Sequence, residues 1–199
     1  MDMVIIAGFL GSGKTSLILN SIDKISERTG KKVAVIVNDF GNIGIDGKVM
    51  EKYGLQVKEL PRGCICCTLG PNFLDAVRSI QDNYHPDLVV VEPSGIADPD
   101  AILATMEHYR GQPLGSIRVV IVLDAVRFPI LIQAMKHPLA KQMRVADMVV
   151  VSKTDEVDEA RLAEVERYTR ERIGDKPIIP VSSVNGHNLD VFVSRLVGA

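Results

Sequence analysis

The sequence predicts an α/β fold with a mainly parallel, doubly wound sheet flanked by helices. Six apolar runs rich in β-branched residues are typical of buried parallel strands, and they lie at residues 3–9, 33–37, 88–91, 119–123, 148–151 and 178–181. Segments with helical periodicity lie between most of them, at residues 14–27, 72–82, 99–109, 128–135, 159–172 and 188–196. Such alternation places helices on both faces of a parallel sheet.

Length and composition indicate one globular domain. The 199 residues are 46% hydrophobic and 24% charged, which excludes the disordered, collagen-like and disulfide-scaffold classes. We therefore expect one domain over residues 1–199, with no separate C-terminal domain. Lys and Arg number 23 against 25 Asp and Glu, so there is no basic surplus to bind nucleic acid or a membrane surface. No apolar run reaches the roughly 18 residues of a membrane span, and we expect a cytoplasmic protein.

An irregular stretch at residues 39–62 interrupts the alternation. It contains several glycines and no clear helix, apart from a short strand-like run at residues 55–60. Long irregular segments after a strand usually serve function in α/β domains. Because right-handed crossovers place the turns after parallel strands along one edge of the sheet, we expect the functional residues to gather there.

Between the first predicted strand and the first predicted helix, the segment 8–15 fits the phosphate-loop pattern G-x-x-x-x-G-K-[ST]. Its backbone N–H groups are expected to surround the β-phosphate, while Lys14 reaches the β and γ oxygens and Thr15 supplies a hydroxyl for Mg²⁺. A glycine turn without ligand is the alternative. The expected nucleotide contacts here are Gly8, Gly11, Ser12, Gly13, Lys14, Thr15 and Ser16.

Three residues after other strands are candidates for the γ-phosphate end of the site. Glu92 ends the third predicted strand, where its carboxylate could hold Mg²⁺ or its water, and Gly95 could offer an amide to the γ-phosphate. Asp39 follows the second strand and could bind Mg²⁺ or the attacking water. The alternatives are a solvated strand-end glutamate and a plain turn aspartate.

Base recognition is expected in the segment 152–155, Ser-Lys-Thr-Asp, where guanine-selective proteins place N-K-x-D. Asp155 could accept two hydrogen bonds from guanine, a donor pair that adenine lacks, and Lys153 would accompany it. Ser152 replaces the usual Asn, which weakens the signal. Ser182 and Ser183 begin a small-residue turn similar to loops that cover guanine O6.

Cys64, Cys66 and Cys67 lie within four positions, too few and too close for a disulfide framework. Two or three thiolates could bind a thiophilic divalent metal, and a further ligand from elsewhere would complete its shell. Such an incomplete shell suits a carrier better than a structural site. The alternatives are buried cysteines acting as small apolar side chains, a redox pair, or an iron–sulfur cluster that bridges subunits.

Together these motifs resemble the CobW-type GTPases, which are kin to the maturation GTPases UreG and HypB. The resemblance spans nearly the whole chain and rests on residues 8–15, 38–41, 44–46, 63–68, 92–95, 97–99 and 152–155. It implies a P-loop NTPase fold in which nucleotide state controls dimerisation and the handling of Zn²⁺, Co²⁺ or Ni²⁺. Asp39 stands where many relatives carry Glu, and Pro93-Ser94 stand where Thr-Thr is frequent.

The expected function is that of a GTP-hydrolysing metallochaperone or metallocofactor-assembly factor. Its cofactors would be GTP/GDP, Mg²⁺ and the thiophilic metal, with Lys14, Asp39 and Glu92 as catalytic residues. Its partners would be a client metalloprotein or cofactor-assembly protein, and a second copy in a nucleotide-dependent homodimer. Two alternatives remain, an ATP-dependent small-molecule kinase and a non-catalytic regulator that senses nucleotide and metal.

Overall fold

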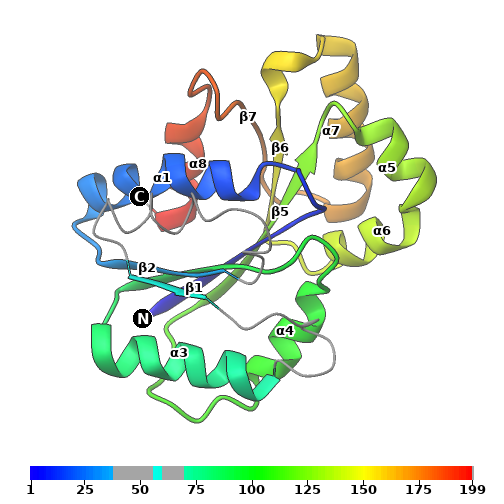
Figure 1. Ribbon diagram of the computed structural model, residues 1–199. Coiled ribbons are helices and arrows are strands. Elements are labelled where there is room, and N and C mark those ends of the chain that lie inside the picture. Colours follow the sequence, from blue (N-terminus) through cyan, green and yellow to red (C-terminus); the bar gives the residue numbers. More distant parts are fainter. Residues whose placement is uncertain (38–55, 60–69, 199) are drawn as a thin grey trace.

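Seven strands among the described residues form one parallel sheet at the centre of the molecule (Figure 1). The computed structural model describes residues 1–37, 56–59 and 70–198. Every neighbouring pair is parallel in the order β3-β2-β4-β1-β5-β6-β7. The strands are β1 (Asp2–Ala7), β2 (Val33–Val37), β3 (Gln56–Glu59), β4 (Leu88–Glu92), β5 (Ile117–Asp124), β6 (Met148–Ser152) and β7 (Ile178–Val181). The predicted parallel α/β fold is confirmed.

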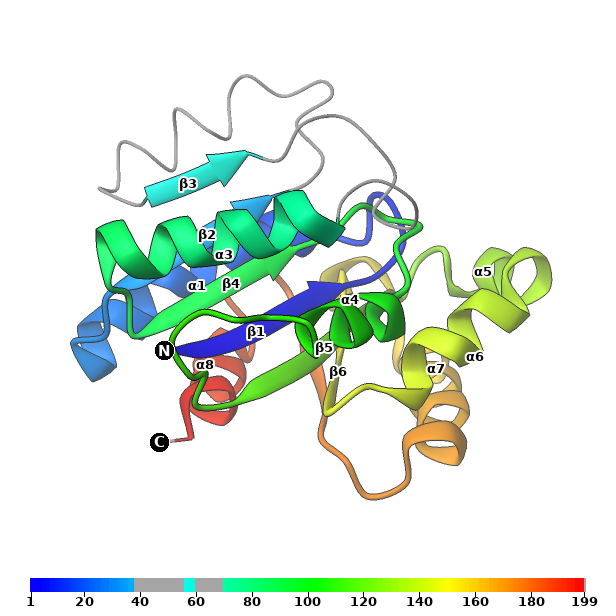
Figure 2. The same cartoon turned by 90° about the horizontal axis from the view of Figure 1, so that it is seen from below.

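Helices cover both faces of this sheet (Figure 2). Helices α1 (Lys14–Thr29) and α8 (Leu189–Val197) pack on one face. The opposite face carries α3 (Gly70–Tyr84), α4 (Pro99–Met106), α5 (Phe128–Ala134), α6 (Lys136–Arg144) and α7 (Glu159–Ile173). Alternate side chains of each strand point to opposite faces, so Met3 and Ile5 enter one core while Val4 and Ile6 enter the other. Burial on both faces explains why β2, β4 and β6 are apolar over nearly their whole length.

The structure differs from the sequence prediction mainly at helix boundaries. Helix α6 was not predicted, because its segment offers only Leu139 and Met143 as buried apolar residues and contains Pro138. That proline lies in the first helical turn, where a missing N–H breaks no intrahelical bond. Helix α4 ends at Met106, earlier than predicted, because His108 and Tyr109 close short turns through their backbone N–H groups.

The carboxyl ends of the central strands lie together at one edge of the sheet. In the sheet, β1 lies between β4 and β5. The next strand in the chain, β2, is not a neighbour of β1 but lies beyond β4. This arrangement creates a switch point beside β1, where open α/β sheets bind their ligands. The register aligns Val37 with Glu92 and Asp124 with Ser152 at this edge. None of the helices in the described residues has the length and apolar character needed to cross a membrane.

Candidate functional site

The phosphate-loop motif, residues 8–15, covers the loop between β1 and α1 and the first two residues of α1, and it is shaped by three glycines. Gly8, Gly11 and Gly13 have φ angles of 146°, 73° and 87°, a region that residues with side chains rarely adopt. A Cβ on Gly8 would lie 2.4 Å from the carbonyl oxygen of Val122, so β5 closes directly on the loop. Gly13 caps α1 without a side-chain acceptor. The first N–H groups of the helix therefore face this loop with the positive end of the helix dipole.

Two side chains of the loop are buried polar groups. Lys14 is 5% exposed, and its Nζ donates to the carbonyl oxygen of Phe9 at 3.4 Å. The buried hydroxyl of Ser12 has no hydrogen-bond partner in the part of the chain that the structure describes. A buried hydroxyl without a partner is costly, and a phosphate oxygen is one group that could satisfy it. Ser16, in the first turn of α1, is exposed.

Thr15 and Glu92, which were predicted from separate motifs, are in direct contact. The Thr15 hydroxyl lies 2.8 Å from Oε1 and 3.0 Å from Oε2 of Glu92, whose residue is 6% exposed. A hydroxyl and a carboxylate are ligand types that Mg²⁺ accepts. Gly95, three residues after Glu92, packs closely against the phosphate loop. A Cβ added to Gly95 would lie 2.4 Å from the Leu10 nitrogen.

The expected base-recognition segment joins the phosphate loop through Ser152. The Ser152 hydroxyl is buried and lies 2.7 Å from the carbonyl oxygen of Ser12 and 3.0 Å from that of Leu123. Lys153 has a left-handed φ of 59°, and Asp155 is exposed in a short 3₁₀ helix. The serine that departs from the guanine-type motif therefore ties β6 to the phosphate loop.

The serine pair after β7 forms a turn. Ser182 is fully buried, and its hydroxyl accepts hydrogen bonds from the backbone N–H groups of Val184 and Asn185 at 3.2 and 3.3 Å. The carbonyl of Ser183 accepts a long 3.5 Å hydrogen bond from Asn20 on α1. The turn is therefore held beside the first helix, while a base contact by either serine stays a prediction.

Sequence reasoning missed Asp124 and Arg127 at the end of β5. Asp124 is fully buried, and its Oδ2 accepts hydrogen bonds from Lys153 Nζ at 2.8 Å and Arg127 Nε at 2.7 Å. Its Oδ1 accepts from the backbone N–H groups of Val126 and Arg127. Burial acts to raise the pKa of Asp124, but the hydrogen bonds from Lys153 and Arg127 outweigh it and hold the pKa below the ordinary value. The available signal was an aspartate that ends a buried apolar strand.

Four predicted site residues lie outside the described residues, namely Asp39, Cys64, Cys66 and Cys67. In the described part of the chain, no group of three His, Cys, Asp or Glu side chains could hold a metal ion. The predicted metal loop therefore stays a prediction.

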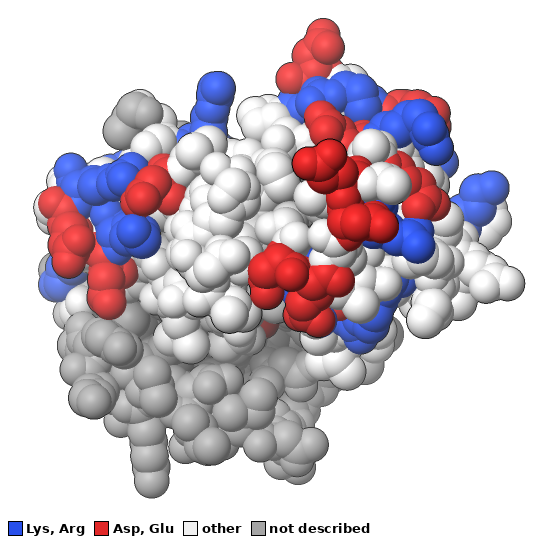
Figure 3. Space-filling view, turned by 90° about the horizontal axis from the view of Figure 1, so that it is seen from above, with Lys and Arg blue, Asp and Glu red and all other residues white. Residues whose placement is uncertain are grey.

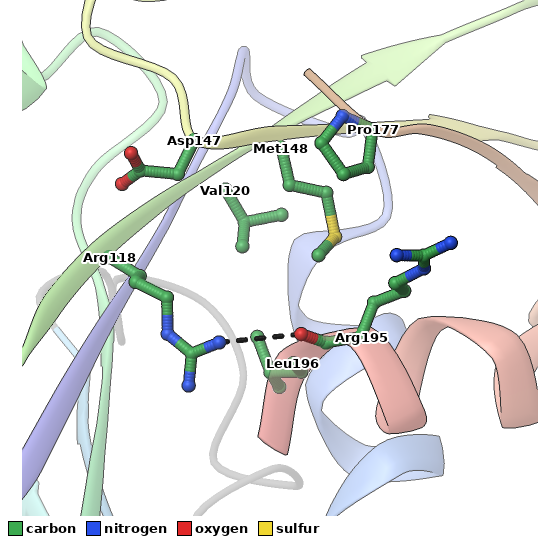
Figure 4. Close-up of a pocket in the computed structure, with 7 residues that line it drawn as sticks. All are labelled: Arg118, Val120, Asp147, Met148, Pro177, Arg195 and Leu196. Atoms are coloured by element: carbon green, nitrogen blue, oxygen red, sulfur yellow. Dashed lines mark hydrogen bonds between the residues drawn. The ribbon is translucent and has the colours of Figure 1, made fainter. Parts of the chain in front are cut away.

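A hollow of about 220 Å³ lies at the opposite edge of the sheet, beside the amino ends of β5 to β7 (Figure 4). Arg118 turns toward α8 and donates to the carbonyl oxygen of Arg195 at 3.3 Å, while Asp147 accepts from the backbone N–H of Val119 at 2.8 Å. The first contact fastens α8 to β5, and the second holds the residue before β6 against β5. The hollow is separate from the phosphate loop.

Comparisons with known proteins agree with this arrangement. A family model described as CobW/HypB/UreG, nucleotide-binding domain, matches residues 2–180. The zinc chaperone YeiR of Escherichia coli is 31% identical over 190 residues, which cover 94% of this chain and 57% of that protein. The chain spans about 60% or less of the length of the first curated relatives that it matches.

Two solved structures share the fold. The hydrogenase maturation factor HypB of Archaeoglobus fulgidus has a TM-score of 0.74 at 21% identity and covers 100% of this chain and 89% of its own. The Zn(II)-bound YjiA GTPase of Escherichia coli has a TM-score of 0.61 at 23% identity and covers 85% of this chain and 54% of its own. The family match spans most of the sequence and includes the phosphate loop, Glu92 and the segment 152–155, so the chain belongs to the CobW/HypB/UreG family of nucleotide-binding domains.

Proposed function

We propose that this chain binds Mg²⁺–GTP at the phosphate loop, hydrolyses it, and uses the nucleotide cycle to deliver a transition metal. The observation that carries the proposal is the contact of the Thr15 hydroxyl with both carboxylate oxygens of Glu92, at 2.8 and 3.0 Å. It supports a site in which a phosphate loop and a carboxylate from the neighbouring strand hold the metal of a metal–nucleotide complex. The names of relatives, zinc chaperone and GTPase, support the metal and the activity.

Each residue of the loop has a role in this proposal. The N–H groups of residues 11–14 and the Lys14 ammonium bind the phosphates, while Thr15 and Glu92 hold Mg²⁺ directly or through its water. Bound Mg²⁺ supplies positive charge that offsets the charge on the phosphate oxygens. Gly95, against the phosphate loop, offers its N–H to the γ-phosphate, and Asp39 orients the attacking water. Phosphate binding also satisfies the unpaired Ser12 hydroxyl.

Guanine selectivity is assigned to Asp155, whose exposed position leaves its carboxylate accessible to a base. Lys153 is held by Asp124 at 2.8 Å, and we assign it to the base side of the site. The turn at Ser182 and Ser183 closes over the guanine oxygen. Because adenine lacks the donor pair that Asp155 accepts, ATP leaves that carboxylate poorly paired.

The metal is the cargo of this cycle, and Cys64, Cys66 and Cys67 are its proposed ligands. Zn²⁺, Co²⁺ and Ni²⁺ all accept thiolates, and a client metalloprotein, a cofactor-assembly protein or a second copy of the chain completes the shell. We place this activity in the cytoplasm, with residues 1–199 working as one unit and the nucleotide favouring a homodimer. On the face seen in Figure 3, charges of both signs flank an uncharged area, and the described residues visible on this face form no continuous basic patch of the kind that nucleic acid needs.

The test combines metal titration with nucleotide turnover. Zn²⁺ is titrated against a competing chelator under reducing conditions, with GDP or a non-hydrolysable GTP analogue bound, for the parent and for Cys64→Ala, Cys66→Ala and Cys67→Ala. We expect stoichiometric binding in the parent that is lost in Cys64→Ala or Cys66→Ala. We expect the two nucleotide states to differ by roughly 5- to 150-fold in metal affinity, the usual range for coupled sites, and linkage then requires the metal to change nucleotide affinity by the same factor. His137→Ala, an exposed side chain elsewhere, is the control.

Three results would contradict parts of the proposal. Unchanged Zn²⁺ binding in all three cysteine variants would exclude the carrier function. Hydrolysis of ATP with transfer to a small acceptor, at equal or better affinity than GTP, would favour a kinase. Turnover below about one per hour with metal and partner present would favour a non-catalytic sensor, and Lys14→Ala gives the reference without turnover.

A further inference from the structure

The phosphate loop is held from outside by two side chains that its motif does not include. The guanidinium of Arg127 donates through Nη2 to the carbonyl oxygen of Leu10 at 2.5 Å and through Nε to Asp124 Oδ2 at 2.7 Å. Its Nη2 also lies 3.0 Å from the place that a Cβ on Gly11 would occupy. On the other side of the loop, the hydroxyl of Ser152 lies 2.7 Å from the carbonyl oxygen of Ser12.

These two contacts fix the peptide groups that must bind phosphate. A peptide group is planar and trans, so its C=O and its N–H point in opposite directions. When Arg127 holds the Leu10 carbonyl, the N–H of Gly11 points away from Arg127. In the same way, the contact of Ser152 with the Ser12 carbonyl directs the N–H of Gly13.

Contacts from outside the loop are needed to fix its backbone, because the glycines of the loop allow several backbone conformations. Gly11 and Gly13, with φ angles of 73° and 87°, adjoin the two peptide groups, and glycine allows such groups to rotate with little steric cost. Donors that are already oriented bind an anion without the cost of ordering them.

Arg127 and Ser152, the two residues that hold the loop, both contact the carboxyl end of β5. Arg127 is anchored on the fully buried carboxylate of Asp124, and the hydroxyl of Ser152 also lies 3.0 Å from the carbonyl of Leu123. Asp124 in addition holds Lys153 at 2.8 Å. The end of β5 is therefore a common support for the phosphate loop and the base-recognition segment.

We infer that Arg127 is a positioning residue for the phosphate loop, supported by Asp124 and matched by Ser152 on the opposite side. The inference rests on the proposed function, since it concerns nucleotide binding at the same loop. The role of Arg127 depends on geometry, because its planar guanidinium bridges the carboxylate of Asp124 and the backbone carbonyl of Leu10. A lysine carries the same charge but cannot reproduce that bridge.

The experiment measures GDP, GTP and ATP affinities by calorimetry for the parent, Arg127→Ala, Arg127→Lys and Ser152→Ala. The control is Arg144→Ala, which removes an exposed arginine paired with Asp100 at 3.0 Å. We expect Arg127→Ala to weaken GDP and GTP binding by roughly tenfold or more, the scale of one lost charge-assisted hydrogen bond. The GTP-to-ATP ratio should stay at the parent value, because the loop binds phosphate and not the base.

Arg127→Lys separates positioning from charge. We expect the nucleotide affinity of Arg127→Lys to be close to that of Arg127→Ala. We also expect Ser152→Ala to bind nucleotide more weakly than the parent. Thermal melts without nucleotide check that each variant folds. Amide exchange at Ser12, whose N–H donates to the carbonyl oxygen of Phe9 at 3.1 Å, should be faster in Arg127→Ala than in the parent. Parent affinity in Arg127→Ala, or full recovery in Arg127→Lys, would overturn the inference while leaving the proposed function intact. A parent that binds no nucleotide would overturn both.

Discussion

Replacing Gly95 with alanine tests whether the loop after β4 sets the position of the phosphate loop. The added Cβ would lie 2.4 Å from the nitrogen and 2.7 Å from the Cα of Leu10. Ordinary contacts begin at 3.4 Å, so the first distance is about 1 Å too short. The crowded atoms belong to the backbone, and no change of rotamer relieves them. Gly95 does not have a positive φ, so alanine can adopt its conformation and the effect is one of contact alone.

The expected effect follows from that displacement. Overpacking of this kind costs roughly 1–3 kcal/mol of folding free energy. If the phosphate loop yields by about 1 Å, the reacting groups are misplaced by a distance that can reduce a rate by about a hundredfold. We therefore predict that Gly95→Ala folds, loses stability by that modest amount, and hydrolyses GTP about a hundredfold more slowly than the parent.

The assay is steady-state GTP hydrolysis together with urea denaturation. Gly30→Ala is the matched control, because Gly30 caps the far end of α1 with a φ of 65° and has nothing within 4 Å of the added Cβ. It should lose about 1 kcal/mol through backbone strain alone and keep its turnover. The reasoning is refuted if Gly95→Ala hydrolyses GTP at the parent rate, or if Gly30→Ala is slowed as much.

Two further predictions concern the base segment and the buried aspartate. GTP should bind at least roughly tenfold more tightly than ATP, and Asp155→Asn should erode this difference, while equal affinities in the parent by calorimetry would remove the guanine assignment. Because the folded-state pKa of Asp124 is lowered, its ion pairs stabilise the fold fully above the ordinary value of 3.8 and progressively less as pH falls below it. The urea midpoint of Asp124→Asn should therefore change less than that of the parent on acidification from neutrality to about pH 3. The pKa of Asp190 is also lowered, by its hydrogen bond with Lys24 and the charges of Lys24 and Arg28, but its ion pairs are exposed and screened by solvent. Asp190→Asn should therefore reduce the pH dependence less than Asp124→Asn does, and equal pH dependence of the parent and Asp124→Asn would contradict the role of the Asp124 carboxylate.

The sequence was informative where one residue type is required by local geometry. A parallel strand buried on both faces is apolar throughout, so the runs that became β1, β4, β5 and β6 could be recognised without neighbours. The glycines of the phosphate loop could also be recognised, because their backbone conformations exclude other residues. Glu92 was predicted as a Mg²⁺ ligand from its place at a strand end. The structure brings its carboxylate to the Thr15 hydroxyl, and its metal-binding role stays a prediction.

Pairings across the sheet could not be predicted in the same way. The contacts of Asp124 with Lys153 and of Arg127 with Leu10 depend on β5 lying between β1 and β6, and the order of strands in the chain does not state which strands are neighbours. Ser152 illustrates the same limit. In the sequence, Ser152 replaces the Asn of the guanine-type motif and weakens that motif. In the structure, its buried hydroxyl contacts the carbonyl of Ser12 across the sheet edge.

The two strands beside β1 support different parts of the site. The β4 side contributes Glu92 and Gly95, which contact the hydroxyl of Thr15 and the backbone of Leu10. The β5 side contributes the buried Asp124 with its bound arginine and lysine, and that arginine holds the carbonyl of Leu10. A change at the γ-phosphate would therefore act first on the β4 side, while the β5 side stays fixed by burial. It follows that substitutions on the β4 side should reduce the rate of hydrolysis more than affinity, whereas substitution of Arg127 on the β5 side should reduce affinity for every nucleotide in the same proportion.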